Sequence, residues 1–372
     1  TSIRGSYGIF YNRNLLVFPN NAASNKITDS VFEAREGSFL DDDGFFLPDD
    51  PTLANPFIGP LIPGADGPTT VDPNLATPYV QQFTLGVERE IVRDLILSVE
   101  GIHTFGVKFP QVRFTPDFAD TGAFVAISTL KNWYDGLFVK LEKRPGSSFY
   151  SFIGSYTFSK ALNLSNDDLV TEPDPLSTQQ IRKGPAVNDI RHRFTMSGIV
   201  NMPLGFKMSS ILTVESAVPV SIFVGGAGGG ALPFVQRGAG ARQFDTGAEL
   251  NAFIRQLNTA RAVPLPLVRD DVRLGNNFVS MDVRLAKDFK VNEKFRIQGI
   301  AEVFNIFNKT NVRGSSGGNF AGIDNVIIRD SNNPSSPGFL RSSNFGARRQ
   351  TAGGVFGTGG PRALQLAVRV QF

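Results

Sequence analysis

Ten segments of this chain alternate apolar and polar side chains with a period of two, the pattern of β-strands that have one apolar face. In the last segment Leu364, Leu366, Val368 and Val370 alternate with Gln365, Ala367, Arg369 and Gln371, and the chain stops at Phe372. The segments lie at about residues 1–12, 79–91, 94–106, 131–144, 147–160, 189–202, 205–218, 277–290, 293–307 and 362–372. Many exceed the five or six residues of a globular strand and suit a tilted membrane strand of about nine or more.

Charged side chains concentrate on the face opposite the apolar one. They include Arg4, Glu88, Glu100, Lys140, Glu142, Arg191, Arg193, Lys207, Glu215, Asp282, Arg284, Arg296, Glu302 and Arg369. An arginine facing hydrocarbon at the bilayer midplane would cost about 2 to 4 kcal/mol. In a membrane barrel the aliphatic face must therefore meet lipid, and the charged face must line a polar lumen.

The connections between the segments alternate between short and long. Tight turns are expected at Val92-Arg93, Pro145-Gly146, Pro203-Leu204 and Val291-Asn292, and long connections at residues 13–78, 107–130, 161–188, 219–276 and 308–361. A sandwich has no reason to alternate in this way, whereas a barrel has short periplasmic turns and long extracellular loops. Five aromatic residues stand on the apolar face beside the short turns, as an interfacial girdle requires: Tyr150, Phe206, Phe289, Phe295 and Phe372.

Composition excludes several other classes of protein. With 372 residues, no stretch approaches the apolar run that a membrane helix needs. The absence of cysteine removes disulfide frameworks and thiolate metal sites. A net charge of +3, spread along the chain, gives no support for nucleic-acid binding. Thr1 is not an initiator and residues 1–12 already have a strand pattern, so we expect the sequence to begin inside a larger protein.

The long connections are rich in turn-forming residues at Gly225–Gly230, Ser315–Gly318 and Pro48–Pro73, and are expected to lie at the surface. One of them contains a helix signal: Leu250, Phe253, Ile254 and Leu257 have helical spacing after a Thr246/Glu249 capping box. We expect a short amphipathic helix within residues 246–261 that lies over the barrel mouth.

Candidate sites for chemistry are few, and each has a structural explanation. Asp41–Asp43 with Asp49 and Asp50 lack the spacing and the distal glutamate of a calcium loop. Gly225–Gly230 lacks the Lys-Ser/Thr of a phosphate loop, and no glycine-flanked nucleophilic serine is present.

The two histidines also have a structural interpretation. His103 and His192 share parity with the lipid-facing residues near the extracellular rim, which predicts interfacial packing rather than catalysis. Arg191 and Arg193 face the lumen and are expected to form ion pairs in the wall. Asp282, Arg284, Arg296 and Glu302 are expected to form charge ladders in the lumen. We therefore predict no catalytic, metal-binding or cofactor-binding residue, and the substrate-contacting residues stay undetermined.

Several hairpins resemble those of a known family. The runs at residues 132–163 (NWYDGLFVKLEKRPGSSFYSFIGSYTFSKALN), 188–203 (NDIRHRFTMSGIVNMP) and 281–308 (MDVRLAKDFKVNEKFRIQGIAEVFNIFN), together with residues 361–372, resemble the C-terminal barrel half of TonB-dependent outer-membrane transporters. The likeness is strongest to the Oar-like group, and Ile3–Tyr11 (IRGSYGIFY) resembles a mid-barrel strand of that group. The segment Phe304–Asn308 and the terminal aromatic strand are its most specific parts.

The resemblance covers the whole chain and implies a function. These strands would be the last ten of a barrel of about 22 with a plug in the lumen. It implies an integral barrel of the Gram-negative outer membrane whose loops recognise a small-molecule or peptide substrate. It also implies partners: outer-membrane lipid, the protein's own N-terminal plug domain and a TonB-type energising protein. The plug, the energising box, the carboxypeptidase-regulatory-like extension and the signal peptide are not within residues 1–372.

The sequence thus predicts an all-β, antiparallel transmembrane barrel segment of about ten strands, which is not an enzyme and supplies wall and recognition loops for energised uptake. Two alternatives stay open at this point. One is a self-contained ten-stranded barrel protease, which would need Asp and His side chains projecting from the rim. The other is an adhesin or passive pore, which would have no plug.

Overall fold

The computed structural model describes residues 1–12, 69–115, 123–146, 148–164, 183–220, 223–225, 231–233, 244–259, 267–290, 292, 295–313, 326–329, 339–340, 345–348, 351–352 and 359–372. Ten strands form the main path of a 12-stranded sheet. They are β1 (Ser2–Tyr11), β3 (Tyr79–Val92), β4 (Leu95–Thr115), β5 (Ala123–Lys143), β6 (Tyr150–Asn163), β8 (His192–Asn201), β9 (Phe206–Glu215), β12 (Phe278–Lys290), β13 (Arg296–Phe304) and β16 (Ala363–Gln371). Each of the ten predicted segments is confirmed as one of these strands.

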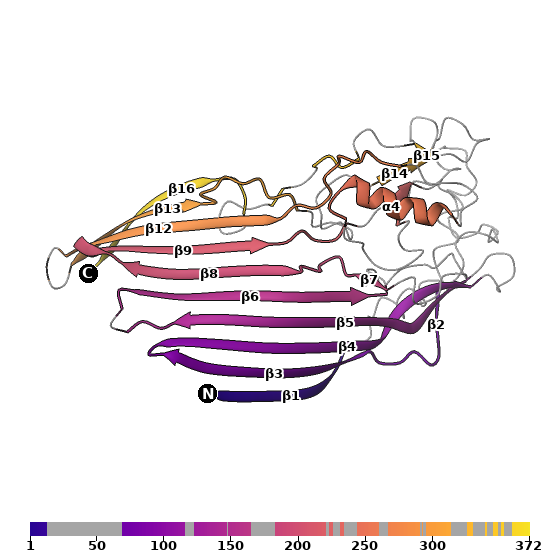
Figure 1. Ribbon diagram of the computed structural model, residues 1–372, viewed down its shortest axis with the longest axis horizontal. Helices are drawn as coiled ribbons and strands as arrows, with labels where there is room; N and C mark the ends of the chain where they lie inside the picture. The colour runs from indigo at the N-terminus through magenta and orange to yellow at the C-terminus, as the bar shows by residue number, and fades with distance from the viewer. Residues whose placement is uncertain are drawn as a thin grey trace, which may run out of the picture.

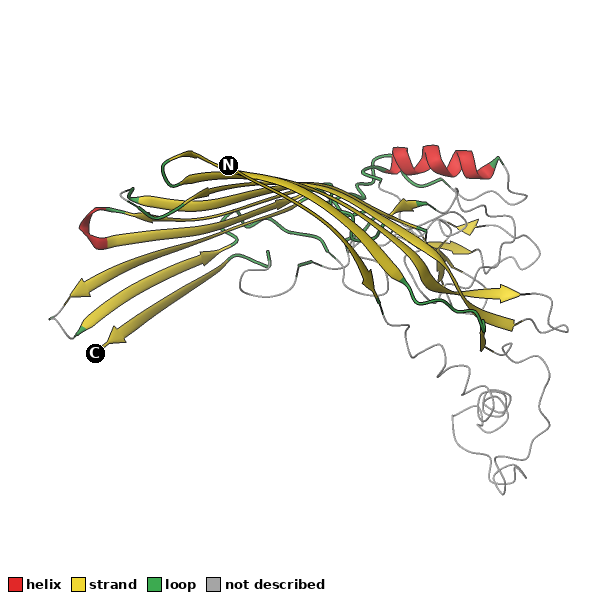
Figure 2. Ribbon diagram, turned by 90° about the horizontal axis from the view of Figure 1, so that it is seen from below, coloured by secondary structure: helices red, strands yellow, loops and turns green. Residues whose placement is uncertain are grey.

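The sheet is a continuous antiparallel meander that stays open. Its order follows the chain, from β1 through β3, β4, β5, β6, β8, β9, β12 and β13 to β16 (Figure 1). Two short strands join it from the side: β2 (Thr69–Val71) pairs with β5, and β7 (Gly184–Pro185) pairs with β6. Figure 2 shows the sheet bent into a trough. β1 and β16 lie at its two edges, and among the described residues they do not pair with each other.

The two ends of the sheet differ, as the alternation of short and long connections predicts. Both chain termini lie at the end that carries the short turns, whereas helix α4 lies at the other end (Figure 1). At the turns, Asp94 adopts a φ of 65°, and the one-turn 3-10 helix η2 (Pro203–Gly205) includes Leu204 at 60° and Gly205 at 76°. Left-handed backbone at these positions lets a strand reverse within a few residues.

The β4–β5 hairpin corrects one prediction. Residues 107–130 were expected to be a long loop, yet residues 107–115 and 123–130 continue the two strands, each of which has 21 residues. Pro110 interrupts the alternation, and the pairing register shifts between Gly106 and Phe109 and again at Pro110. The resulting bulges absorb the irregular sequence while the hairpin goes on, so a break in the pattern did not mean the end of the strand.

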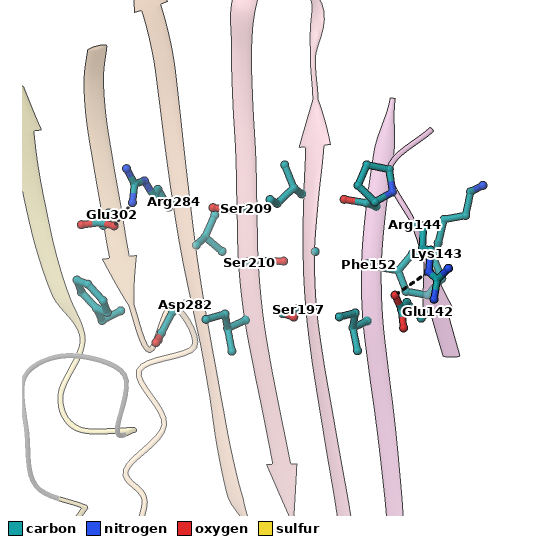
Figure 3. Close-up of a pocket in the computed structure, with 18 residues that line it drawn as sticks. Glu142, Lys143, Arg144, Phe152, Ser197, Ser209, Ser210, Asp282, Arg284 and Glu302 are labelled. Atoms are coloured by element: carbon teal, nitrogen blue, oxygen red, sulfur yellow. Dashed lines mark hydrogen bonds and ion pairs between the residues drawn. The ribbon is translucent and has the colours of Figure 1, made fainter. Parts of the chain in front are cut away.

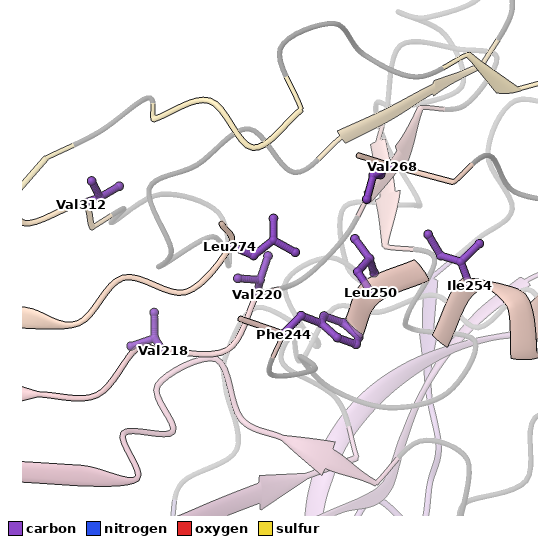
Figure 4. Packing of buried hydrophobic residues seen from close by; sticks show 8 residues of the cluster. All are labelled: Val218, Val220, Phe244, Leu250, Ile254, Val268, Leu274 and Val312. Carbon is purple, nitrogen blue, oxygen red and sulfur yellow. The ribbon is translucent and has the colours of Figure 1, made fainter. Parts of the chain in front are cut away.

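The long connections contain a folded subdomain, which the sequence did not predict. A second sheet has the order β11 (Ala231–Pro233), β10 (Phe223–Gly225), β14 (Val326–Arg329), β15 (Phe339–Leu340). Helix α4 (Gly247–Asn258) packs in the same region (Figure 1). Eight buried residues form an apolar cluster there (Figure 4): Val218, Val220, Phe244, Leu250, Ile254, Val268, Leu274 and Val312. We call α4 with this cluster the loop cap. No helix in the described part of the chain has the length and apolar character needed to cross a bilayer.

Helix α4 confirms the predicted capping box. The Thr246 hydroxyl accepts the Glu249 N–H at 3.3 Å. The Glu249 carboxylate accepts the N–H of Asp245 at 2.7 Å, one residue before the usual partner. Leu250 and Ile254 are fully buried, and the buried Asn251 side chain bonds both the N–H and the C=O of Val268. The side chain of Leu257 lies outside the described residues.

We expect Thr246→Ala to loosen α4 by about 1 kcal/mol, because an N-terminal N–H of the helix loses its acceptor. Amide hydrogen exchange of Leu250 and Asn251 should then be roughly fivefold faster, as 1 kcal/mol implies. The matched control is Thr259→Ala, which removes a hydroxyl that donates to the Gln256 carbonyl at 2.7 Å just beyond the other end of the helix. Equal exchange in the wild type and Thr246→Ala would contradict a capping role.

Asparagine side chains hold the chain together where β13 ends and β16 begins. Buried Asn305 donates to the carbonyls of Lys309 at 3.0 Å and Gly360 at 2.7 Å. Buried Asn311 donates to the carbonyl of Gly359 at 2.9 Å and exchanges hydrogen bonds with both backbone groups of Val279. The Phe304–Asn308 segment thus carries a backbone clasp, in which Asn305 and Asn308 have positive φ angles of 45° and 48°.

Candidate functional site

The apolar face of the main sheet is open rather than packed against another layer. Leu366 and Val368 in β16 are each 72% exposed, and Leu85 in β3 is 65% exposed. A sandwich would bury these side chains between two sheets about 10 Å apart. The same face carries exposed aliphatic or aromatic side chains on further strands: Ile3, Tyr7, Phe83, Leu137, Tyr156, Phe158, Met196 and Leu285. An apolar surface of this extent is suited to lipid.

Aromatic residues border the apolar face at both ends. At the short-turn end, Lys287 lies over the rings of Phe206 and Phe289, 4.5 and 5.0 Å from their centroids. At the loop end, ring pairs occur between Tyr11 and Tyr79 at 5.7 Å and between Phe105 and Trp133 at 5.7 Å. The sequence analysis predicted only the girdle at the short-turn end. The four rings at the loop end also lie in predicted segments, and the strand register brings them together in pairs.

The polar face carries ion pairs between neighbouring strands. Arg284 pairs with Glu302 at 3.5 Å, as the predicted ladder requires. Arg4 pairs with Glu88 at 3.2 Å, and Glu88 also accepts the Ser98 hydroxyl at 2.8 Å. Two other members of the predicted ladder behave differently. Asp282 accepts the backbone N–H of Asn305 at 2.8 Å, and Arg296 lies exposed at the short-turn end, opposite Gln371 in the register.

A hollow of 610 Å³ lies on this polar face across β5, β6, β8, β9, β12 and β13 (Figure 3). Its middle is lined by Ser197 and Ser209, and charged pairs flank it: Arg284 with Glu302 on one side and Arg144 with Glu142 on the other. Ile153, Ile199 and Ile211 also line it and are 46%, 42% and 58% exposed. The hollow therefore offers hydroxyls, ion pairs and an aliphatic patch, a surface suited to an amphipathic contact.

Ion pairs tie the polar face to the loop side. Arg193 contacts Glu215 at 2.9 Å, and Arg313 bonds the second oxygen of the same carboxylate. The Glu215 side chain is only 6% exposed. Arg191 contacts the fully buried Asp189 at 2.7 Å, and Asp189 also accepts the N–H of Ala161 at 2.7 Å. The predicted wall pairing of Arg191 and Arg193 is confirmed. Arg191 binds Asp189 of its own segment, whereas Arg193 binds Glu215 of the neighbouring strand β9.

Both histidines lie on the apolar face, as predicted. The His192 ring is tilted against that of Phe158 with centroids 5.1 Å apart, and its Nδ1 is 2.8 Å from the Tyr156 hydroxyl oxygen. His103 lies between Phe83 and Asp135, and its Nδ1 is 2.6 Å from an Asp135 oxygen. The sequence analysis did not predict the His103–Asp135 pair, although Asp135 lies on the same face of its strand as Leu137. The pair points away from the polar face, where a catalytic imidazole would be expected.

Several candidate segments lie outside the described residues. These are Asp41–Asp43, Asp49, Asp50, Gly226–Gly230 and Ser315–Gly318, and Gly225 is the last residue of β10. Within the described ranges, no three His, Asp or Glu side chains group closely enough to hold a metal ion. In the loops, the Nε and Nη2 of Arg269 donate to the two carboxylate oxygens of Asp271, at 2.9 and 2.5 Å, and these hydrogen bonds lower the pKa of Asp271.

Comparison with known proteins agrees with this geometry. The chain is similar in structure to the outer membrane transporter YddB from Escherichia coli, with a TM-score of 0.52 and 11% sequence identity, over 99% of this chain and 38% of YddB. It is also similar to the ferric-catecholate import receptor Fiu from Escherichia coli K12, with a TM-score of 0.41 and 13% identity, over 81% of this chain and 28% of Fiu. No match was found among curated proteins.

The YddB similarity concerns the fold, and this chain spans less than half of the length of either transporter. The family assignment comes from a model of the outer membrane beta barrel domain, which matches residues 1–365. An exposed apolar face, a charged opposite face, aromatic borders and alternating connections are all properties of such barrels. The chain therefore belongs to the outer membrane beta barrel domain family and is an integral barrel part of the outer membrane.

Proposed function

We propose that this chain forms the C-terminal part of the wall, and the extracellular recognition loops, of a TonB-dependent receptor-like transporter. The main support is the open ten-strand path, which has one apolar and one charged face. A wall of this kind separates lipid from water only when further strands complete it. The chain matches 38% of the length of an outer membrane transporter, which fits a chain that forms one part of a larger barrel wall.

In this proposal the loop cap provides the outer recognition surface. Its cluster is built from segments far apart in the sequence, such as Val220, Leu250 and Val312, and is therefore a folded platform. Binding residues are commonly carried on loops that a rigid scaffold positions. The hollow on the polar face then lies along the path inward, and an upstream plug domain would fill the lumen beside it. Import would use force from a TonB-type inner-membrane partner.

The alternative functions receive less support from the geometry. A self-contained ten-stranded barrel would pair β1 with β16, and these strands lie at opposite edges of the described sheet. A rim protease would direct its Asp and His side chains toward the lumen, whereas His103 and Asp135 lie on the apolar face beside Phe83. A passive pore or an adhesin would need neither a plug nor an energising partner.

The experiment compares cells that carry the full-length gene with a deletion strain and with a strain that lacks the TonB-type energising protein. Depletion of small molecules and peptides from the medium is followed by mass spectrometry. We expect the same compound to remain outside both mutant strains. Steady ion conductance of the purified full-length protein in planar bilayers, with uptake that is independent of the energising protein, would support the pore and contradict the proposal.

A further inference from the structure

The apolar face becomes charged near the loop end of β4, β5 and β6. His103, Asp135 and Lys160 are register partners and form one row across these strands. His103 follows Leu95, the first residue of β4, by eight residues. At about 3.3 Å per residue and a tilt of about 40°, the row lies roughly 20 Å above the short turns. The apolar band of a barrel is about 25 Å tall, so this row is at the outer membrane interface.

A hollow of 750 Å³ lies directly beside this row. Gly101 has no side chain to fill it, and a Cβ added there would meet only the Leu85 carbonyl oxygen, at 3.9 Å. Leu85, Leu137 and Phe158 provide apolar walls, and His103, Asp135 and Lys160 line the charged side. The hollow thus has room for an aliphatic chain that ends in a polar head.

Two more lysines lie at the same end of the sheet. The Lys108 Nζ is 5.5 Å from the centroid of the Tyr79 ring, and the Lys183 Nζ is 3.9 Å from the centroid of the Trp133 ring. We call Lys108, Lys160 and Lys183, with His103, the outer-rim patch. Asp135, which contacts His103, adds one negative charge beside the three lysines, so this region carries a net positive charge. Aromatic rings hold two of the lysines at the level where lipid headgroups lie.

We propose that the outer-rim patch binds a phosphorylated lipid of the outer leaflet. One acyl chain lies in the hollow over Gly101, and the phosphate accepts charge-assisted hydrogen bonds from the lysines. A free phosphate would leave the apolar part of the hollow unused, which favours a lipid as the occupant. This site is separate from the proposed uptake function and depends only on residence in the outer membrane.

The first test measures binding of diphosphoryl lipid A to the detergent-purified full-length protein by native mass spectrometry. A surface lysine contributes roughly fivefold to binding of an anionic lipid, so Lys160→Gln and Lys183→Gln should each weaken binding by about that factor. The matched control is Lys287→Gln, which removes a lysine from the aromatic girdle at the short-turn end. Its binding should equal that of the wild type.

The second test separates the acyl chain from the phosphate. Gly101→Leu fills the hollow without changing charge and should weaken binding roughly tenfold, as expected when a few methylene groups lose their contacts. Dephosphorylated lipid A should bind the wild type as weakly as diphosphoryl lipid A binds a double variant that combines Lys160→Gln and Lys183→Gln. Equal binding by wild type and double variant, an equal loss in Lys287→Gln, or displacement by inorganic phosphate alone would overturn the proposal. The glutamine variants leave packing intact, so the outcome does not depend on how Gly101→Leu folds.

Discussion

Replacing Val99 with arginine should lower the stability of the membrane-inserted full-length protein by about 2 to 4 kcal/mol. Val99 lies on the apolar face of β4, between Val87 and Val139 in the register. It follows Leu95 by four residues, which places it roughly 10 Å above the short turns and close to the midplane of the apolar band. A guanidinium there would have to enter hydrocarbon. The measurement is urea-induced unfolding in phospholipid vesicles.

The control for this change is Ser98→Arg, one residue away on the polar face. Ser98 donates to Glu88, so an arginine at this position gains a carboxylate partner in a polar surrounding. We expect it to change the stability by less than about 1 kcal/mol, as is usual for exposed ion pairs. Equal losses for Val99→Arg and Ser98→Arg would mean that the two faces have not been assigned to lipid and lumen correctly.

Replacing Asn305 with alanine should cost about 2 to 4 kcal/mol, because it leaves buried backbone groups without partners. Its side chain bonds the carbonyls of Lys309 and Gly360 and accepts the Lys309 N–H at 3.3 Å. Loss of these bonds should release the segment that leads into β16. Urea unfolding of the full-length protein and proteolysis of intact cells from outside should both report the change.

Asn308→Ala is the control, since Asn308 has nearly the same positive φ as Asn305. Its side chain accepts one long bond, from the Arg362 N–H at 3.4 Å, and the residue is exposed. Backbone strain from alanine is therefore common to both variants, and their difference isolates the buried hydrogen bonds. If both variants unfold at the same urea concentration, the clasp contributes nothing beyond backbone conformation.

The strands and their faces could be predicted because a period of two decides which side chains share a surface. The neighbours Val368 and Arg369, for example, require opposite surroundings, and in the structure Val368 lies on the exposed apolar face. The β4–β5 hairpin was underestimated, because Pro110 breaks the alternation while bulges continue the pairing. Helix α4 was predictable because its cap and its apolar spacing are both local in sequence.

Arg284 pairs with Glu302, as the predicted ladder requires, but other polar partners could not be predicted, because they depend on contacts distant in sequence. Glu215 and Arg313 are 98 residues apart, and Asn305 and Gly360 are 55 apart. The loop cap brings Val218 and Val312 into one cluster through connections that show no periodic pattern. The His103–Asp135 pair was within reach, because both residues share parity with neighbouring apolar positions on adjacent segments.

The open edges of the sheet have a consequence for biogenesis. β1 and β16 are the edge strands of the described sheet, and their outer sides carry backbone amide and carbonyl groups with which another extended chain could pair. Such rows template aggregation when nothing occupies them. If further strands complete the wall as proposed above, they would pair with these two edges, and we expect cells to shield β1 and β16 from synthesis until that pairing forms.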